Sequence, residues 1–185
     1  METPLSDYAR GAAVATDLVT TSPTVREEAL PTPGALASFL EEHRIRLDTV
    51  SFPSAEDLHH VHLLRREVRA IMETETADQA VAGAHVLIGR AGLAPRLRHS
   101  DDGWQWSVPT APGAGLADEL AALIGLGLLG VVRSLGHSRF RPCAAPDCRG
   151  VFVDTSRAGR RRYCMPDRCG NRLNVANHRA RRVSP

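Results

Sequence analysis

The residues best suited to chemistry in this chain are four cysteines, which fall in two pairs. Cys143 and Cys148 enclose four residues, Cys164 and Cys169 enclose four more, and fifteen residues separate the pairs. A tetrahedral Zn²⁺ takes four thiolate ligands, and two short cysteine loops joined by a longer one supply them. Four thiolates leave no open position on the metal for water or substrate. The pattern therefore predicts one structural Zn²⁺ and no catalysis at this site.

Two other arrangements of these cysteines are compatible with the spacing. Most zinc ribbons place two residues between paired cysteines rather than four, so the spacing favours zinc without deciding it. A pair of disulfides needs an oxidising compartment, but the first seven residues lack the basic and apolar regions of a secretory signal. We therefore expect a cytoplasmic protein. Four unrelated buried thiols are a third arrangement, which the two matched pairs argue against.

The elements that hold the cysteines are predicted from turn residues and apolar patterns. Residues 150–155 read as a strand, 156–159 as a turn and 160–164 as the returning strand, and residues 170–182 carry an apolar helical stripe. A knuckle, a hairpin and a helix that begins at the last ligands form a treble-clef-like arrangement. A module of about 45 residues buries little apolar surface, so we expect the metal to act as its core. The apolar side chains expected beside it are Phe152, Tyr163 and Leu173.

Charge divides the chain at about residue 138. Residues 1–138 contain 11 arginines against 18 acidic residues, a net of −7, and residues 139–185 contain 12 arginines against 3 aspartates, a net of +9. Four thiolates with one Zn²⁺ lower the net charge of residues 139–185 by two, to about +7. A basic module on an acidic body is typical of a protein that binds a polyanion. A solvated basic tail is the alternative interpretation.

Several side chains of the basic module are suited to nucleic acid. Arginine contacts phosphates and guanine, and asparagine reads the edge of adenine. The module has few aromatic residues, which favours duplex DNA over a surface that stacks single strands. The predicted contact residues are Arg160, Arg161, Arg162, Asn171, Arg172, Asn174, His178, Arg179, Arg181 and Arg182.

The body that carries this module is predicted to be mainly helical. Apolar periodicity and capping residues predict helices at about 12–20, 33–43, 55–73, 77–91 and 116–135. Thr32 is the expected N-cap of the second helix, and Ser54 with Asp57 forms an expected capping box before the third. The predicted fold class is α+β and mostly α. It comprises a helical domain at 1–138 with a small hairpin, followed by the treble-clef-like zinc module at 139–185.

Two features of the body carry further expectations. Alternating residues around Asp102-Gly103 predict a hairpin. Trp104 and Trp106 are expected on its core face, and a binding platform is the alternative. The helix at 116–135 contains three glycines, so its backbone should pack closely against a neighbour. The neighbour is either another part of the body or a second copy in a homodimer. The longest apolar run, residues 120–132, is shorter than the roughly 20 residues that cross a bilayer.

A resemblance to known families adds to this interpretation. The cysteine spacing followed by Gly170, Asn171 and Arg172, together with residues 154–157 and the basic terminal segment, resembles the CGNR zinc finger. Residues 17–21, 64–69 and 95–106 resemble the ABATE domain that usually precedes this finger. Thr20 is a departure, since the family more often has asparagine there. The resemblance implies the four cysteines as zinc ligands and a helical N-terminal domain with a small sheet. It also implies a regulator of transcription under stress. Asn171 caps the terminal helix or contacts DNA, and the sequence does not choose between these roles.

We therefore expect a bacterial transcription regulator whose zinc module binds DNA. The acidic body either forms a homodimer or senses a signal such as a small-molecule effector. One alternative is a module that binds RNA or protein, and another is a small-molecule sensor whose zinc is only a brace, including a thiol redox switch. A large apolar pocket in the body would favour the sensor. We expect no enzyme, because the chain has no phosphate-binding loop, nucleophile motif or defensible acid–base pair, and no membrane partner.

Overall fold

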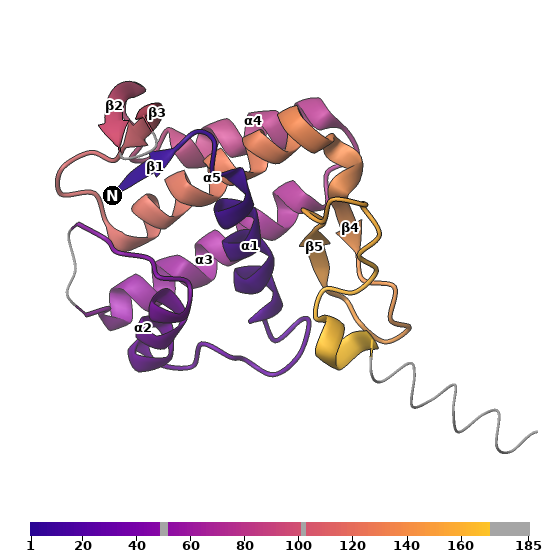
Figure 1. Cartoon of the computed structure of the whole chain (residues 1–185). Coiled ribbons are helices and arrows are strands. Elements are labelled where there is room, and N and C mark those ends of the chain that lie inside the picture. Colours follow the sequence, from indigo (N-terminus) through magenta and orange to yellow (C-terminus); the bar gives the residue numbers. More distant parts are fainter. Residues whose placement is uncertain (49–51, 101–102, 171–185) are drawn as a thin grey trace, which may run out of the picture.

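The computed structural model describes residues 1–48, 52–100 and 103–170, and within them it confirms an α+β fold that is mostly helical (Figure 1). The helices are α1 Tyr8–Thr20, α2 Pro33–Glu42, α3 Ala55–Met72, α4 Ala77–Ile88 and α5 Leu116–Leu135. The strands are β1 Glu2–Pro4, β2 Arg96–Ser100, β3 Gly103–Pro109, β4 Phe140–Pro142 and β5 Val151–Val153. A 3₁₀ turn at His137–Arg139 and a π-helical turn at Pro166–Gly170 complete the described elements.

Local signals place most helix starts correctly. The Thr32 side chain accepts a hydrogen bond from the Ala35 N–H, and Pro33 opens α2. Ser54 and Asp57 form the predicted capping box of α3. In contrast, α1 begins at Tyr8, earlier than the predicted residue 12. Its first turn is helical because it packs against α5, which the local pattern does not reveal.

The long apolar helix α5 is the central helix of the body. Its three glycines lie where another part of the chain approaches too closely for a side chain. A Cβ on Gly125 would lie 2.8 Å from the Ala84 carbonyl in α4, and a Cβ on Gly127 would lie 2.6 Å from the Cα of Gly11 in α1. Gly130 meets the Tyr8 side chain in the same way. Packing inside one chain therefore accounts for these glycines without a second copy.

The first sheet is antiparallel, in the order β1-β3-β2, and its two ends differ in burial. Thr3 in β1 pairs with Val108 in β3, and both are buried against the body. Farther along the same face, Trp104 and Trp106 are 68% and 54% exposed. The prediction that these tryptophans face the core is therefore wrong, because the hairpin extends beyond the helices that would cover them.

The hairpin of the zinc module differs from the predicted one. Antiparallel β4 and β5 pair Phe140 with Val153 and Pro142 with Val151, whereas residues 160–164 form a loop rather than a strand. The side chains of Phe140, Val151 and Val153 join the hydrophobic core of the body. The boundary at residue 138/139 stays a prediction, and the two parts share this core. Within the described ranges, none of the helices has the length and apolar character that crossing a membrane requires.

Candidate metal centre and basic surface

The four cysteine sulfurs lie together, and the distances among those of Cys148, Cys164 and Cys169 match the edges of a tetrahedral site. All four Sγ atoms lie within 4.8 Å of one another. The Sγ–Sγ distance is 3.6 Å between Cys148 and Cys164 and 3.8 Å from Cys169 to each of them. A ZnS₄ tetrahedron with bonds of about 2.3 Å has edges of about 3.8 Å. All four cysteines are free rather than joined in disulfides. They form a site that can bind one structural Zn²⁺.

Short elements on both sides of the site position the ligands. Cys143 directly follows β4, and Cys148 lies between it and β5. Cys164 ends the loop that returns from β5, and Cys169 lies in the π-helical turn. Phe152 is fully buried against Cys143, Cys164 and Cys169, as predicted for an apolar side chain beside the metal. Tyr163 packs against the same cluster, whereas Leu173 lies outside the described residues.

The electrostatics of the site favour a divalent cation. Burial, followed by contact with neighbouring cysteines, raises the pKa of the Cys164 and Cys169 thiols. Backbone N–H groups point at two of the sulfur atoms: Gly150 donates to Cys148 over 3.3 Å, and Cys164, over 3.5 Å, and Ala145 donate to Cys143. These donors offset only part of the charge of four thiolates. A bound Zn²⁺ keeps coordinating thiols deprotonated, so the donor set and its charge fit this ion.

Gly150 allows the backbone to approach the sulfurs. A Cβ at this position would lie 2.5 Å from the Cys164 Sγ and 3.2 Å from the Cys148 Sγ. The glycine therefore leaves the space that the two ligands occupy, while its N–H donates to Cys148. Sequence reasoning assigned Gly150 only to a strand and missed this role. Its position two residues after Cys148 was the available signal.

Asp154 organises the loop that follows β5. Its carboxylate is fully buried and accepts hydrogen bonds from the Ser156 N–H and hydroxyl, the Arg161 N–H and the Arg141 guanidinium. Burial alone would raise the pKa of Asp154, but these donors outweigh it and hold the pKa below its usual value. Arg139 donates to the carbonyls of Asp154 and Ser156 and fixes the loop from the other side. The roles of Asp154, Arg139 and Arg141 were not predicted.

The predicted nucleic-acid contacts divide into three groups. Arg160 and Arg162 are exposed, and the Arg162 guanidinium lies 5.8 Å from the centre of the Tyr163 ring. Arg161 instead turns inward, where it donates to the carbonyls of Tyr163 and Cys164 and lies over the Phe152 ring. The other seven lie outside the described residues: Asn171, Arg172, Asn174, His178, Arg179, Arg181 and Arg182.

Two further arginines extend the exposed basic surface. Arg157 lies on the loop that Asp154 organises, and Arg168 lies on the π-helical turn. Both are exposed, and within the described part of the chain neither has an acidic partner. Together with Arg160 and Arg162 they form what we call the basic surface. With Arg149, which is also exposed beside Cys148, the described part of the chain brings five exposed arginines onto the segments that surround the cysteine site.

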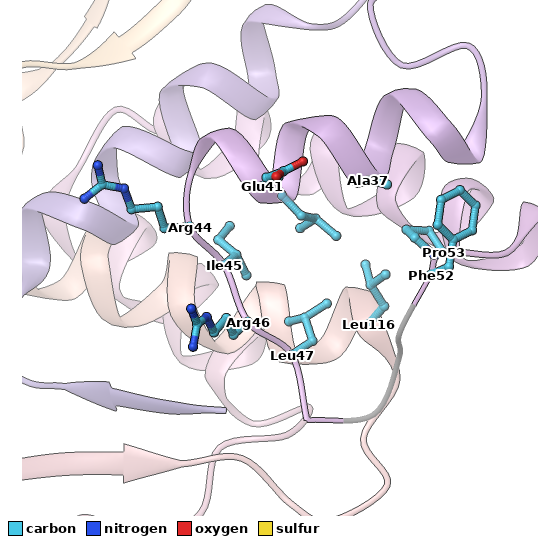
Figure 2. A pocket seen from close by; sticks show the side chains of 10 residues that line it. Ala37, Glu41, Arg44, Ile45, Arg46, Leu47, Phe52, Pro53 and Leu116 are labelled. Atoms are coloured by element: carbon cyan, nitrogen blue, oxygen red, sulfur yellow. The ribbon is translucent and has the colours of Figure 1, made fainter.

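The body contains a separate pocket of about 600 Å³, formed by the end of α2, the segments on either side of residues 49–51 and the start of α5 (Figure 2). Apolar side chains surround the hollow, and the charged residues Glu41, Arg44 and Arg46 lie at its edge. The apolar lining comprises Ala37, Leu40, Ile45, Leu47, Phe52, Pro53 and Leu116. Sequence reasoning did not locate this pocket, because Leu116 in α5 is far in the chain from the other lining residues, which lie between 37 and 53.

Comparison with known families agrees with this architecture. The model of the ABATE family, described as "Putative stress-induced transcription regulator", matches residues 12–133. The model of the CGNR zinc finger matches residues 139–182, which include all four cysteines. A search among curated proteins finds no match.

Proposed function

Because this chain belongs to the ABATE family and carries a CGNR zinc finger, we propose that it regulates transcription by binding duplex DNA through the basic surface. The observation that carries the proposal is that the described arginines of the finger divide into a set with partners inside the finger and a set without them. Arg139, Arg141 and Arg161 are held by carbonyl and carboxylate groups inside the finger. The arginines of the basic surface have no such partners within the described residues and face solvent.

This division supports a phosphate-binding role. Solvated guanidinium groups that no carboxylate neutralises are available to phosphates, and releasing counterions from DNA then drives binding. Arg139, Arg141 and Asp154 fix the loop from which Arg157, Arg160 and Arg162 project. The zinc site fixes the turn that carries Arg168. In this proposal the metal shapes the surface and takes part in no reaction, and the chain is not an enzyme.

Residues 171–182 complete the proposed interface. Phosphate contacts orient a protein on DNA but carry little sequence information, which comes from contacts to base edges. Asn171, Asn174 and His178 supply side chains of the kind that read bases. We assign base reading to these three side chains, and phosphate binding to the basic surface together with the arginines of residues 171–182.

The test is binding of labelled genomic duplexes followed by fluorescence anisotropy at several salt concentrations. If about six phosphates are contacted, log K should fall against log salt with a slope of about −5. The double variant Arg160→Ala/Arg162→Ala should reduce this slope by about 2, whereas Arg66→Ala, which removes an exposed arginine of α3, should leave it unchanged. Absence of duplex binding, binding indifferent to salt, or preference for structured RNA over every duplex would overturn the proposal.

The pocket of the body favours a second role, in which it binds a small ligand that has both apolar and polar groups. Its volume falls within the range of small-molecule sites, and apolar and polar groups contribute about equally to its wall. Ligand-observed NMR with a library of small amphipathic fragments tests this role. Fragments should bind the wild type and fail to bind Ala37→Trp, in which the new side chain occupies the hollow. If no fragment binds, or if the variant binds them equally well, the pocket has no such role.

A further inference from the structure

The hairpin of β2 and β3 carries an apolar surface that the proposed function does not use. Leu97 pairs with Trp106, and Trp104 lies two residues away on the same strand, so the three side chains share one face. All three are exposed. At the other end of this face Val108 and Thr3 are buried. The face therefore begins in the core and continues into solvent, where large apolar side chains are unusual without a partner.

The same hairpin leaves one strand edge open. In the order β1-β3-β2, β2 is the outer strand, and within the described ranges no strand pairs with its outer edge. Residues 96–99 of this strand are exposed. An edge strand offers unpaired backbone N–H and C=O groups, which an extended chain can pair with. The hairpin lies at the end of the body away from β4 and β5 (Figure 1).

Charge on the opposite face of β2 indicates what kind of strand fits. Arg96 and Arg98 alternate with Leu97, so they lie on the face away from the tryptophans. Glu2 in β1, on the other side of β3, pairs with Arg98 and is the only acidic residue among the three strands, which leaves a net charge of +1 there. Opposite charges on directly facing positions of paired strands stabilise the pair, and like charges destabilise it.

We propose that the outer edge of β2 binds an extended segment of a partner protein whose acidic and apolar side chains alternate. The apolar side chains lie beside Leu97, Trp104 and Trp106, and the acidic ones face Arg96 and Arg98. Main-chain hydrogen bonds to β2 supply affinity, and the alternation supplies specificity. In the sequence Asp101 and Asp102 follow β2. We therefore place the acidic residues of the partner beside residues 96–98 only, where the charge of β2 is positive.

The test uses the full-length protein and a blocked nine-residue peptide that alternates valine and glutamate. Trp104 and Trp106 are the only tryptophans of the chain, so tryptophan emission reports directly on this surface. We expect a saturable blue shift with this peptide, and binding at least about tenfold weaker with a peptide that alternates valine and lysine. The variant Arg96→Glu/Arg98→Glu should reverse the preference, a result that partial unfolding would not produce.

Three outcomes would overturn the proposal. The first is that neither peptide binds, and the second is that both bind equally well and the charge-reversed variant does not change this. The third is a dimer of the free protein, seen by sedimentation velocity and dissolved by Trp106→Ala, which would assign the surface to a second copy. The experiment does not depend on DNA binding, so its failure leaves the role of the zinc finger untouched.

Discussion

The backbone N–H of Val153 in β5 donates a hydrogen bond of 2.9 Å to the side-chain hydroxyl of Thr16 in α1. Both residues are almost fully buried. The same hydroxyl donates to the carbonyl of Ala12 one turn earlier in α1, so it hydrogen-bonds one backbone group in the helix and one in the strand. This contact ties the strand beside the metal site to a helix of the body, while the Val153 side chain packs into the shared core. The stability of the finger and that of the body should therefore be coupled.

Replacing Thr16 by valine tests this contact. The substitution keeps the shape of the side chain but leaves the buried Val153 N–H without its acceptor, at a cost of about 1–3 kcal/mol. Urea denaturation of the zinc-bound protein should show this loss. Thr16→Ser is the control: it keeps the acceptor and loses one methyl group, about 1 kcal/mol. A Thr16→Val protein as stable as the wild type would show that the contact does not couple the two parts.

Removing the metal should destabilise more than the finger. The purified protein is expected to contain one zinc per chain, which metal analysis by mass spectrometry measures. Chelation should lower the melting temperature of the whole protein, because Phe140, Val151 and Val153 leave the shared core when the cysteine site opens. Restoring one equivalent of Zn²⁺ should reverse the change. An unaltered transition after verified loss of zinc would contradict the coupling.

Gly150→Ala should weaken zinc binding. The added Cβ would lie 2.5 Å from the Cys164 Sγ, so that ligand or the backbone must shift. Changes beside metal ligands typically cost 10–100-fold in affinity, and we expect a loss of about this size. Competition with a chromophoric chelator measures it. The matched control is Gly34→Ala in α2, where the nearest atom to a new Cβ is 3.8 Å away. Equal zinc affinity in the two variants would rule out the proposed role of Gly150.

Features encoded by neighbouring residues were predictable from the sequence. The caps at Thr32 and at Ser54 with Asp57 act within one helical turn, so the starts of α2 and α3 follow from the chain itself. The metal site was predictable for the same reason, because the residue types and spacing of the four cysteines already specify a tetrahedral set of ligands. Family resemblance then identified the finger from the same residues.

Features decided by distant residues were not predictable. The first turn of α1 depends on the fit between Gly11 and Gly127, far apart in the chain. Trp104 and Trp106 alternate with polar residues as core-facing residues of a strand do. Whether helices cover that end of the hairpin depends on the tertiary structure, and they leave both side chains exposed. Arg161 has the same side chain as its two neighbours, and only the positions of Phe152 and two carbonyls turn it inward.

The ion pair between Glu28 and Arg65 should make stability depend on pH. The Arg65 guanidinium donates two hydrogen bonds of 2.7 Å to the Glu28 carboxylate. These bonds hold the pKa of Glu28 below its usual value, although burial opposes them. A carboxyl whose pKa is lower in the folded state binds fewer protons there than in the unfolded state. Its contribution is therefore complete above the unfolded value of about 4.3 and disappears as the pH falls through the lower folded value.

Glu28→Gln should accordingly be less stable than the wild type at pH 7, because Arg65 is only 5% exposed and loses its charge partner. Between about pH 5 and pH 3 the gap in unfolding free energy should narrow, because the wild type loses this contribution and the variant does not. Urea titrations at several pH values measure the gap. Glu27→Gln, at the exposed neighbouring position, controls for general acid effects and should follow the wild type. A gap that stays constant with pH would mean that the Glu28 carboxylate contributes nothing through its charge.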